Sequence, residues 1–336
     1  MINDKIDIVY LWVDSSDKKW RAEKDKWLEK ITGKKPLYKG AADEERFRDN
    51  GEFLHSLRSV AECVPWINHI YIITGFNQKP KWLNTKHPKI TIVPHEEIMP
   101  KSALPTFNAT SIEMCIPNIK NLSEKFILMN DDMFFNKHLS PDFFFDKHGR
   151  ARVYFNSHRS HPKDINQWMA TLDGYTKTLL KSAKILEDNF GKKLYFGRPS
   201  HGIDPYLKSS WIECLKNPNI KKQVNKQIKN KFRSDDEIQR WTFNLYDLIK
   251  GRAVFSHARA RKYGKRKIIS FIYNILHFNS IRKSNIVCTN TIIAKSAILK
   301  APTFCLNDSS DNTPEILRAN AQFLEERFPN KCEFEK

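Results

Sequence analysis

The sequence predicts an α/β protein with a mostly parallel sheet covered by helices, and three observations favour this fold class. Short apolar runs rich in β-branched residues recur along the first part of the chain. Segments with helical spacing of apolar residues separate these runs, so strand and helix alternate. The second part is mostly helical in pattern, and no flexible linker divides it from the first. We therefore expect residues 1–150 to form the α/β part and residues 151–336 a helix-rich part, integrated into one domain around one cleft.

The elements of the first part follow in order. Residues 6–13, 69–74, 90–94 and 126–129 are apolar enough to be strands buried on both faces. A helix is expected over about residues 20–31, capped by Ser16 or Asp17. A second helix covers about residues 53–61 and stops before Pro65, and a third covers about 110–119 with Asn108 as its cap. The carboxyl ends of such parallel strands form the edge at which ligands bind.

The second part shows two clear helices. Apolar residues from Ile238 to Ile249 share one face, and Gly251 is placed to end that helix. Residues 234–237 have the composition of a helix start. Pro314 suits the first turn of a final amphipathic helix that extends to about Phe328.

Composition excludes several classes of protein. The 336 residues are 40% apolar, which is enough for a substantial core and excludes a disordered tail protein. The six cysteines form no CxxC pair, so neither a zinc site nor a disulfide framework is expected. The formal net charge of +19 attracts nucleic acid, anionic lipid or a polyanionic substrate. The basic residues are spread over the chain and no nucleic-acid module is recognised, so we expect no nucleic-acid partner.

Two features concern location. The chain contains no run of about 20 apolar residues that would span a bilayer, and its start lacks the layout of a signal peptide. We therefore expect a cytoplasmic protein with reduced thiols. Residues 250–283 combine a basic cluster with an apolar run, which favours peripheral contact with an anionic membrane at the inner face of the cell membrane. A solvated loop followed by a core helix is the alternative.

Asp131 and Asp132 follow the last apolar strand of the first part. Paired carboxylates at the open edge of a sheet suit Mg²⁺ or Mn²⁺, which prefer hard oxygen ligands. Taken alone, the pair is also typical of a turn or a helix cap.

The topology places Asp14 and Thr74 at the same strand ends as this pair. Other charged residues are further candidates for the chemistry. Glu113 lies at the border of an apolar helix face, and a helix-surface acid is the alternative. The segment Arg46 to Glu52 and the later Arg58 offer guanidinium groups that grip a diphosphate or form salt bridges. His201 lies in a turn rich in Gly and Pro, where an imidazole serves as a general base or is only a surface residue. Arg233 precedes the apparent helix start, where it either faces an anion or pairs with the acids that follow.

Read together, these motifs resemble the Stealth family of sugar-phosphate transferases. Four blocks carry the resemblance, in the order of the family. They are IDIVYLWVD from Ile6; the stretch from Arg46 to Phe145 with RFRDNGE, SLRS, PTFN and NDDMFF; the HGIDPY and FRSDDE segments; and CLND with the closing FLEERFP. Leu11 and Ser15 stand where the family usually has threonine and glycine. Residues 53–55 also differ from the residues that usually precede Ser56 in the family.

The resemblance implies a site and a Rossmann-like, GT-A-like fold. The family's catalytic group corresponds to Glu113, Asp132, His201 and Arg233, with Asp131 and Asp132 as metal ligands. The donor contacts that we expect are Trp12, Asp14, Arg46, Asn50, Arg58, Thr74 and Asn108.

The resemblance also implies a reaction. An acceptor glycan hydroxyl attacks the sugar-bearing phosphorus of a UDP-hexose, typically a UDP-N-acetylhexosamine, and releases UMP in capsule or cell-surface polysaccharide synthesis, assisted by Mg²⁺ or Mn²⁺. His201 would remove the hydroxyl proton and Arg233 would neutralise the phosphoryl oxygens. Three alternatives remain: a metal-dependent glycosyltransferase releasing UDP, a nuclease or nucleic-acid-binding protein, and a non-catalytic membrane adaptor.

Overall fold

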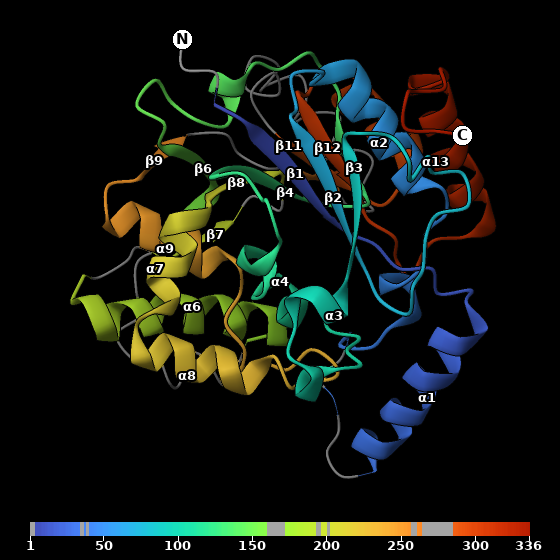
Figure 1. The fold of residues 1–336 in the computed structure, drawn as a ribbon. Helices are drawn as coiled ribbons and strands as arrows, with labels where there is room; N and C mark the ends of the chain where they lie inside the picture. Colours follow the sequence, from blue (N-terminus) through green and yellow to red (C-terminus); the bar gives the residue numbers. More distant parts are fainter. Residues whose placement is uncertain are drawn as a thin grey trace.

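The computed structural model describes residues 4–33, 37, 40–159, 172–192, 196–199, 202–256, 261–263 and 285–336. Within them the chain forms one five-stranded sheet and two smaller sheets, with helices packed around them (Figure 1). The five-stranded sheet has the strand order β3-β2-β1-β4-β8. Its strands are β1 (Ile6–Leu11), β2 (His69–Thr74), β3 (Ile90–Pro94), β4 (Lys125–Asn130) and β8 (Asp204–Leu207).

The predicted strands of the first part are confirmed, and so is the α/β class. β1 pairs in parallel with both β2 and β4, and β2 pairs in parallel with β3. Only β8, from the second part of the chain, runs antiparallel. The central strands are apolar on both faces because both faces are covered: Ile8, Val9 and Leu128 are fully buried. Each such side chain contributes about 1.5–3 kcal/mol through its removal from water.

The helices of the first part are α1 (Lys18–Thr32), α2 (Glu52–Cys63), α3 (His95–Ile98) and α4 (Ala109–Glu113). Asp17 caps α1, because its carboxylate accepts a hydrogen bond from the Trp20 amide at 2.8 Å. The third predicted helix is shorter than expected. Asn108 caps it as predicted, but α4 ends at Glu113 and a 3₁₀ turn over Ile116–Asn118 follows. Pro117 explains the break, since it lacks an amide hydrogen and disfavours α conformation in the residue before it.

The second part contains helices, as expected, and also short strands that the sequence did not reveal. Its helices are α6 (Gly174–Phe190), α7 (Lys208–Leu215), α8 (Pro218–Gln227), α9 (Trp241–Ile249), α12 (Thr291–Ile298) and α13 (Pro314–Arg327). Its strands besides β8 are β6 (Ala151–Arg159), β7 (Phe196–Pro199), β9 (Ala253–Ser256), β10 (Arg261–Tyr263), β11 (Asn285–Cys288) and β12 (Thr303–Leu306). Most are only three or four residues long, too short for a periodic signal in the sequence.

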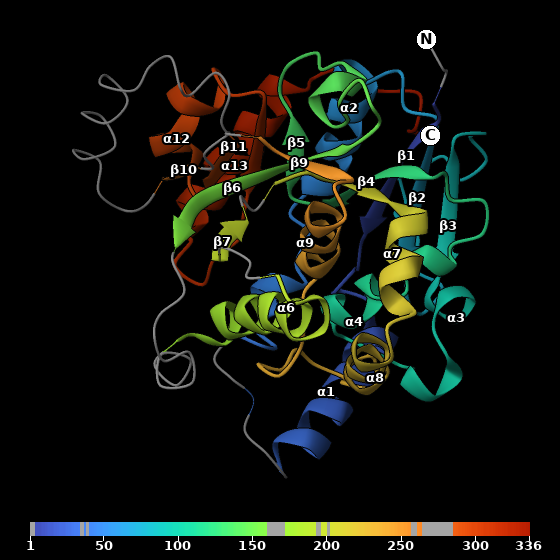
Figure 2. The ribbon, with the colours of Figure 1, turned by 90° about the vertical axis from the view of Figure 1, so that its left-hand side faces the viewer.

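The two smaller sheets tie distant parts of the chain together. One has the order β10-β11-β12-β5, in which β5 (Met133–Phe135) follows β4 directly and runs antiparallel to β12. The other has the order β7-β6-β9. Figure 1 shows α13 beside α2, so the C-terminal segment packs on the first part of the chain. Figure 2 shows α6, α7, α8 and α9 gathered as one group beside the large sheet.

The segment before α9 corrects a predicted helix start. Residues 234–237 form a turn, and α9 begins only at Trp241. The reason is that Gln227 at the end of α8 binds both backbone groups of Ile238, accepting from its amide at 3.0 Å and donating to its carbonyl at 2.9 Å. The backbone amide and carbonyl of Ile238 therefore bond to the Gln227 side chain and not to the backbone of a helix. Gly251, with φ of 71°, follows α9 as expected.

The largest hydrophobic core contains residues of both parts of the chain, from Ile6 to Phe334. The division at residue 150 stays a prediction. None of the helices in the described ranges is both long and apolar enough to cross a membrane. The expected membrane-contact segment, residues 250–283, lies largely outside the described residues, which include only 250–256 and 261–263 of it.

Candidate active site

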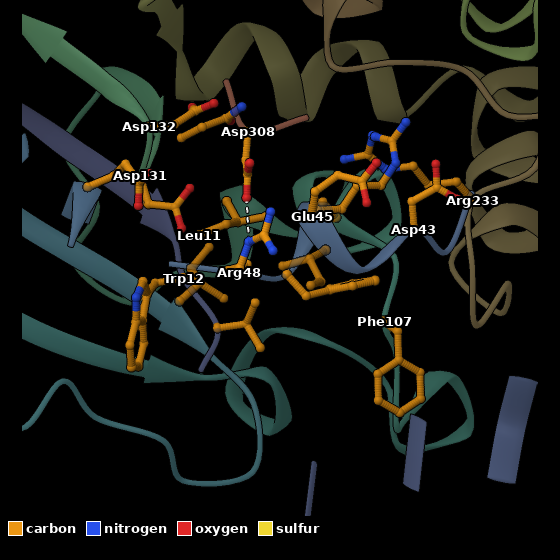
Figure 3. Close-up of a pocket in the computed structure, with 18 of the residues that line it drawn as sticks. Leu11, Trp12, Asp43, Glu45, Arg48, Phe107, Asp131, Asp132, Arg233 and Asp308 are labelled. Carbon is orange, nitrogen blue, oxygen red and sulfur yellow. Dashed lines mark hydrogen bonds and ion pairs between the residues drawn. The ribbon is translucent and has the colours of Figure 1, made fainter. Parts of the chain in front are cut away.

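A cavity of about 410 Å³ opens where β1, β2 and β4 end (Figure 3). Its floor comes from the residues that follow these strands, and one wall comes from the loop after β12. The charged residues that line it are Asp43, Glu45, Arg46, Arg48, Glu52, Glu113, Asp131, Asp132, Arg233 and Asp308. Most of them are acids although the protein as a whole is strongly basic. The cavity therefore combines guanidinium groups with an excess of carboxylates.

Half of the predicted site residues meet in this cavity. They are Trp12, Arg46, Glu113, Asp131, Asp132 and Arg233. They come from the ends of β1 and β4, from α4 and from the loops before α2 and α9. The parallel topology explains the convergence, because the carboxyl ends of neighbouring strands lie at one edge of the sheet.

Asp131 and Asp132 form the turn between β4 and β5, where the chain passes from the large sheet to the four-stranded one. The carbonyl of Asp132 accepts a hydrogen bond from the Leu306 amide at 2.9 Å, and its carboxylate accepts one from the Cys305 thiol at 3.3 Å. Burial raises the pKa of that thiol well above its usual value. The protonated thiol is thus a donor that fixes the Asp132 carboxylate. The last two residues of β12, Cys305 and Leu306, therefore set the geometry of this turn.

The acids at this turn repel one another. Burial raises the pKa of Asp131 well above its usual value, and the charges of Asp132, Asp49 and Glu52 raise it further. Burial likewise raises the pKa of Glu52 to about 7, against hydrogen bonds from Asn50 that lower it. In the absence of a cation, this corner of the cavity disfavours full ionisation.

The carboxylate oxygens of Asp131 and Asp132 suit a divalent cation that also binds a ligand. Among the residues that the structure describes, no group of three or more His, Cys, Asp or Glu side chains forms a ready-made metal cage. Mg²⁺ typically takes only one or two protein carboxylates and completes its shell with water and substrate phosphate. Asp131 and Asp132 supply such a pair, and their mutual repulsion is the kind that a cation relieves.

Glu113 is held by a buried arginine that sequence reasoning missed. Arg240, the residue before α9, donates to the Glu113 carboxylate at 2.8 Å and to the Asn130 side-chain oxygen at 3.2 Å. Its second nitrogen lies 3.8 Å from the Asp204 carboxylate at the start of β8. Burial works to lower the pKa of Arg240, but the charges of Glu113 and Asp204 outweigh it and raise the pKa. Arg240 thus joins α4, β4 and β8 behind the cavity.

Arg233 lines the cavity from the turn before α9. The position over a helix amino end that the sequence suggested is wrong, because the helix starts seven residues later than Ser234. The turn is fixed from behind by Glu237, which is fully buried. Its carboxylate accepts from Asn108 at 2.7 Å and from Asn230 at 2.8 Å. The Arg233 backbone is therefore held by a buried network between this turn and the start of α4.

Arg48 and Asp308 are a second pair that sequence reasoning did not assign. The Arg48 guanidinium donates to the Asp308 carboxylate at 2.6 Å, as the dashed line in Figure 3 marks. Hydrogen bonding to Arg48 works to lower the pKa of Asp308 and outweighs the effect of burial. Both residues belong to motifs quoted above, RFRDNGE and CLND, which is the only signal that pointed to them. Their ion pair joins two segments that are 260 positions apart in the sequence. Both residues line the cavity.

Five predicted donor contacts are absent from the cavity lining, and four of them have structural roles near it. Asp14 accepts from Ser16, and its backbone is clamped by the Gln78 amide. Thr74 donates to the carbonyl of Gln78 at 3.1 Å. Asn108 caps α4 and binds Glu237, and Asn50 donates to Asp308 at 3.4 Å. His201, the predicted base, lies outside the described residues, next to the described Gly202.

Arg58 lies away from the cavity, which corrects its placement as a donor contact. Its guanidinium makes two hydrogen bonds to the Glu335 carboxylate, at 2.9 and 3.0 Å, and one to the Phe328 carbonyl at 2.9 Å. Replacing Arg58 by methionine should destabilise the fold by about 3 kcal/mol, because Glu335 is left buried without its cation. The KM for the donor should not change. Thermal unfolding measures the stability, and initial rates measure the KM. A raised KM at unchanged stability would show that Arg58 contacts the donor after all.

Two buried carboxyl groups predict how stability depends on pH. Burial raises the pKa of Glu237 to about 7 and that of Asp247 to about 7. The folded protein then binds these protons more tightly than the unfolded chain does. The free energy of unfolding should therefore fall as pH rises from about 5 to about 7, by up to about 1.4 kcal/mol per pH unit for each group. Glu237→Gln should flatten this dependence in thermal unfolding, whereas Gln at the exposed Glu315 should leave it unchanged.

The α/β fold and the charged cavity at the carboxyl edge of its sheet define this protein as one of the α/β class with a candidate active site at the strand ends. Stealth protein conserved region 1 matches residues 4–32, conserved region 2 matches residues 46–153, and conserved region 4 matches residues 296–336. The chain belongs to the Stealth family and is a phosphotransferase.

Relatives align over almost the whole chain. A capsular polysaccharide phosphotransferase WcwK of Streptococcus pneumoniae is 32% identical, with 99% of this chain and 98% of the relative covered. The exopolysaccharide phosphotransferase cps2G of Lactiplantibacillus plantarum is 28% identical, with 98% and 96% covered. The capsular polysaccharide phosphotransferase fcs1 of Haemophilus influenzae is 31% identical, with 94% and 81% covered.

Solved structures show more distant similarity. The galactosyltransferase LgtC, in complex with donor and acceptor sugar analogs, superposes with a TM-score of 0.45 and 10% identity, covering 96% of this chain and 95% of that chain. The bifunctional glycosyltransferase WbbM in its apo form gives a TM-score of 0.45 and 10% identity, with 98% and 50% covered.

Proposed function

We propose that this protein transfers a hexose-1-phosphate from a UDP-hexose to a hydroxyl group of an acceptor glycan during the synthesis of a capsule or other cell-surface polysaccharide. The observation that carries the proposal is the meeting of Asp131, Asp132, Glu113 and Arg233 in one cavity. Acids beside guanidinium groups suit a diphosphate whose charge is partly balanced by a cation. The names of the relatives, which are polysaccharide phosphotransferases, support the same reaction.

In the proposed reaction the acceptor oxygen bonds to the phosphorus that carries the sugar. The bond from that phosphorus to the bridging oxygen breaks, UMP leaves, and the sugar phosphate becomes a phosphodiester. His201 takes the hydroxyl proton. Arg233, which lines the cavity, would neutralise the negative charge that develops on the phosphoryl oxygens and so stabilise the transition state more than the ground state.

Asp131 and Asp132 would hold Mg²⁺ or Mn²⁺ together with the diphosphate. When bound, the ion would supply positive charge that neutralises the leaving UMP. Glu113 has a different role, because its carboxylate is already paired with Arg240. It orients the donor through a hydrogen bond to a sugar hydroxyl, for which an ionised carboxylate is a strong acceptor.

The acceptor is a glycan chain that carries phosphodiester links. Each transfer adds a negative charge to such a chain, and a protein with net charge +19 attracts it. Peripheral contact with an anionic membrane through residues 250–283 suits the same site of synthesis.

The released nucleotide tests the proposal. The protein is incubated with Mg²⁺, an acceptor glycan and a panel of UDP-sugars, and the nucleotide product is identified chromatographically. We expect UMP from one of the sugars, and a glycan product whose ³¹P resonance is that of a phosphodiester. Release of UDP together with a phosphorus-free glycan would instead identify an ordinary glycosyltransferase, and EDTA should stop turnover in either case.

A further inference from the structure

His95 lies on the cavity wall at the far end of the sheet edge from the acids. It is the first residue after β3, and it lines the cavity together with Ile73 and Gly75 at the end of β2. The register of β2 with β3 continues from Thr74 and Pro94 to place Gly75 beside His95. A side-chain carbon at Gly75 would stand 2.9 Å from two atoms of the imidazole ring. The glycine thus leaves the space in which the ring sits.

The His95 imidazole is largely buried and has no hydrogen-bond partner among the residues that the structure describes. It is only 8% exposed, and no hydrogen bond or ion pair links its ring to another residue in the described ranges. Burial lowers the pKa of His95 to about 4, so the ring is neutral near pH 7. A neutral imidazole carries one donor and one acceptor nitrogen. Because His95 lines the cavity, a ligand that displaces water there must supply a hydrogen-bond partner for the ring or leave it unpaired.

The place of His95 indicates which part of a ligand it meets. Along the sheet edge the order is β3, β2, β1 and β4, so three strand intervals, about 14 Å, separate His95 from the Asp131–Asp132 turn. That span exceeds a monosaccharide and corresponds to an extended nucleoside diphosphate. If phosphates occupy the acidic end with a cation, the other end of the nucleotide reaches His95.

The aromatic part of the cavity lining suits a flat, uncharged group. Phe107 stacks on Phe232 with ring centroids 5.4 Å apart and meets the edge of Trp20 at 5.5 Å, so its ring is held rigidly. In Figure 3 Phe107 lies across the cavity from Asp131 and Asp132. A neutral imidazole adds hydrogen-bonding capacity without charge, which suits the polar edge of a heteroaromatic base better than it suits a phosphate.

We propose that the His95 imidazole hydrogen-bonds the nucleobase of the donor nucleotide, in a slot that the missing side chain of Gly75 leaves open. The inference rests on the proposed function, in which the donor is a nucleoside diphosphate sugar. His95 is then a specificity-determining residue, because a base that cannot satisfy the imidazole leaves it buried and unpaired.

Nucleotide binding tests this directly and does not depend on turnover. Wild-type protein and the variants His95→Phe and His138→Ala are titrated calorimetrically with UDP, CDP, GDP, ADP and inorganic pyrophosphate in the presence of Mg²⁺. His138 is exposed and serves as the control. We expect His95→Phe to weaken the preferred nucleotide about 10- to 100-fold and to leave pyrophosphate unchanged, since one hydrogen bond to a neutral base is lost. Equal loss for pyrophosphate, or no loss for any nucleotide, overturns the proposal.

Gly75→Ala is a second variant that keeps the imidazole but displaces it. We expect the same loss of nucleotide affinity, and no further loss when Gly75→Ala and His95→Phe are combined, because both remove one contact. Additive losses would contradict the proposal, and thermal unfolding confirms that each variant is folded. If wild-type protein binds a nucleotide through His95 but releases no UMP from UDP-sugars, the proposed function fails while this inference stands.

Discussion

Replacing Asp132 by asparagine is expected to lower kcat for UMP release by about 10²- to 10³-fold, the usual cost of removing one charged group aimed at a transition state. Asparagine has the same shape and keeps an oxygen that accepts the Cys305 hydrogen bond. The backbone bond from Leu306 to residue 132 is unaffected. The fold should therefore survive, and circular dichroism with thermal unfolding checks this alongside initial rates.

Asp131 offers the matched variant within the same turn. Burial and neighbouring acids raise its pKa, so its ionised form is unfavourable in the folded protein. Asp131→Asn should therefore raise the melting temperature at pH 8 and cost less activity than Asp132→Asn. Asp142→Asn, at an exposed acid outside the cavity, should change neither quantity. Wild-type turnover by Asp132→Asn would remove Asp132 from the proposed chemistry.

Replacing Arg240 by methionine is expected to have the largest effect on stability. Glu113 and Asp204 would lose the cation that lies between them, and a buried charge left without its partner costs about 3–5 kcal/mol. Activity should fall as well, because Glu113 and Asn130 would lose a common anchor at the cavity. Urea unfolding measures the first effect, and kcat and KM measured at a temperature where the variant is folded measure the second.

The test of Arg240 needs variants that separate positioning from folding. Combining Arg240→Met with Glu113→Gln should recover part of the stability but none of the activity, since the uncompensated charge is removed while the donor contact stays lost. Lys184→Met removes an exposed ion pair with Asp188 and should cost at most about 0.5 kcal/mol. A double variant with no regained stability would show that Arg240 does not act through Glu113.

Local patterns in the sequence were enough for the central sheet. The strands from His69 and from Ile90 were bounded correctly because continuous β-branched runs have few other solutions. The parallel topology placed Asp14, Thr74 and the Asp131–Asp132 pair at one edge, and of these the two adjacent acids line the cavity. Boundaries failed where a single local feature overrode periodicity, as Pro117 does after α4 and Gln227 does before α9.

Local patterns in the sequence could not predict which residues of distant segments pair. Arg58 and Arg48 lie in the same stretch and have the same chemistry. Arg58 nevertheless pairs with Glu335 near the C-terminus, whereas Arg48 lines the cavity beside Asp308. Likewise, nothing local distinguishes Arg240 from Arg233. Only the folded chain buries Arg240 between Glu113 and Asp204 and leaves Arg233 on the cavity wall.

The sequence by itself determined the α/β class, the edge of the sheet that carries the site, the Asp131–Asp132 pair and the family. The tertiary structure alone decided which polar residues face the cavity, which support it from behind, and that His95 sits in the gap left by Gly75. The physical reason is range: periodicity and strand ends are local properties of the chain. Burial, ion pairing and the resulting pKa shifts depend on groups that only folding brings together.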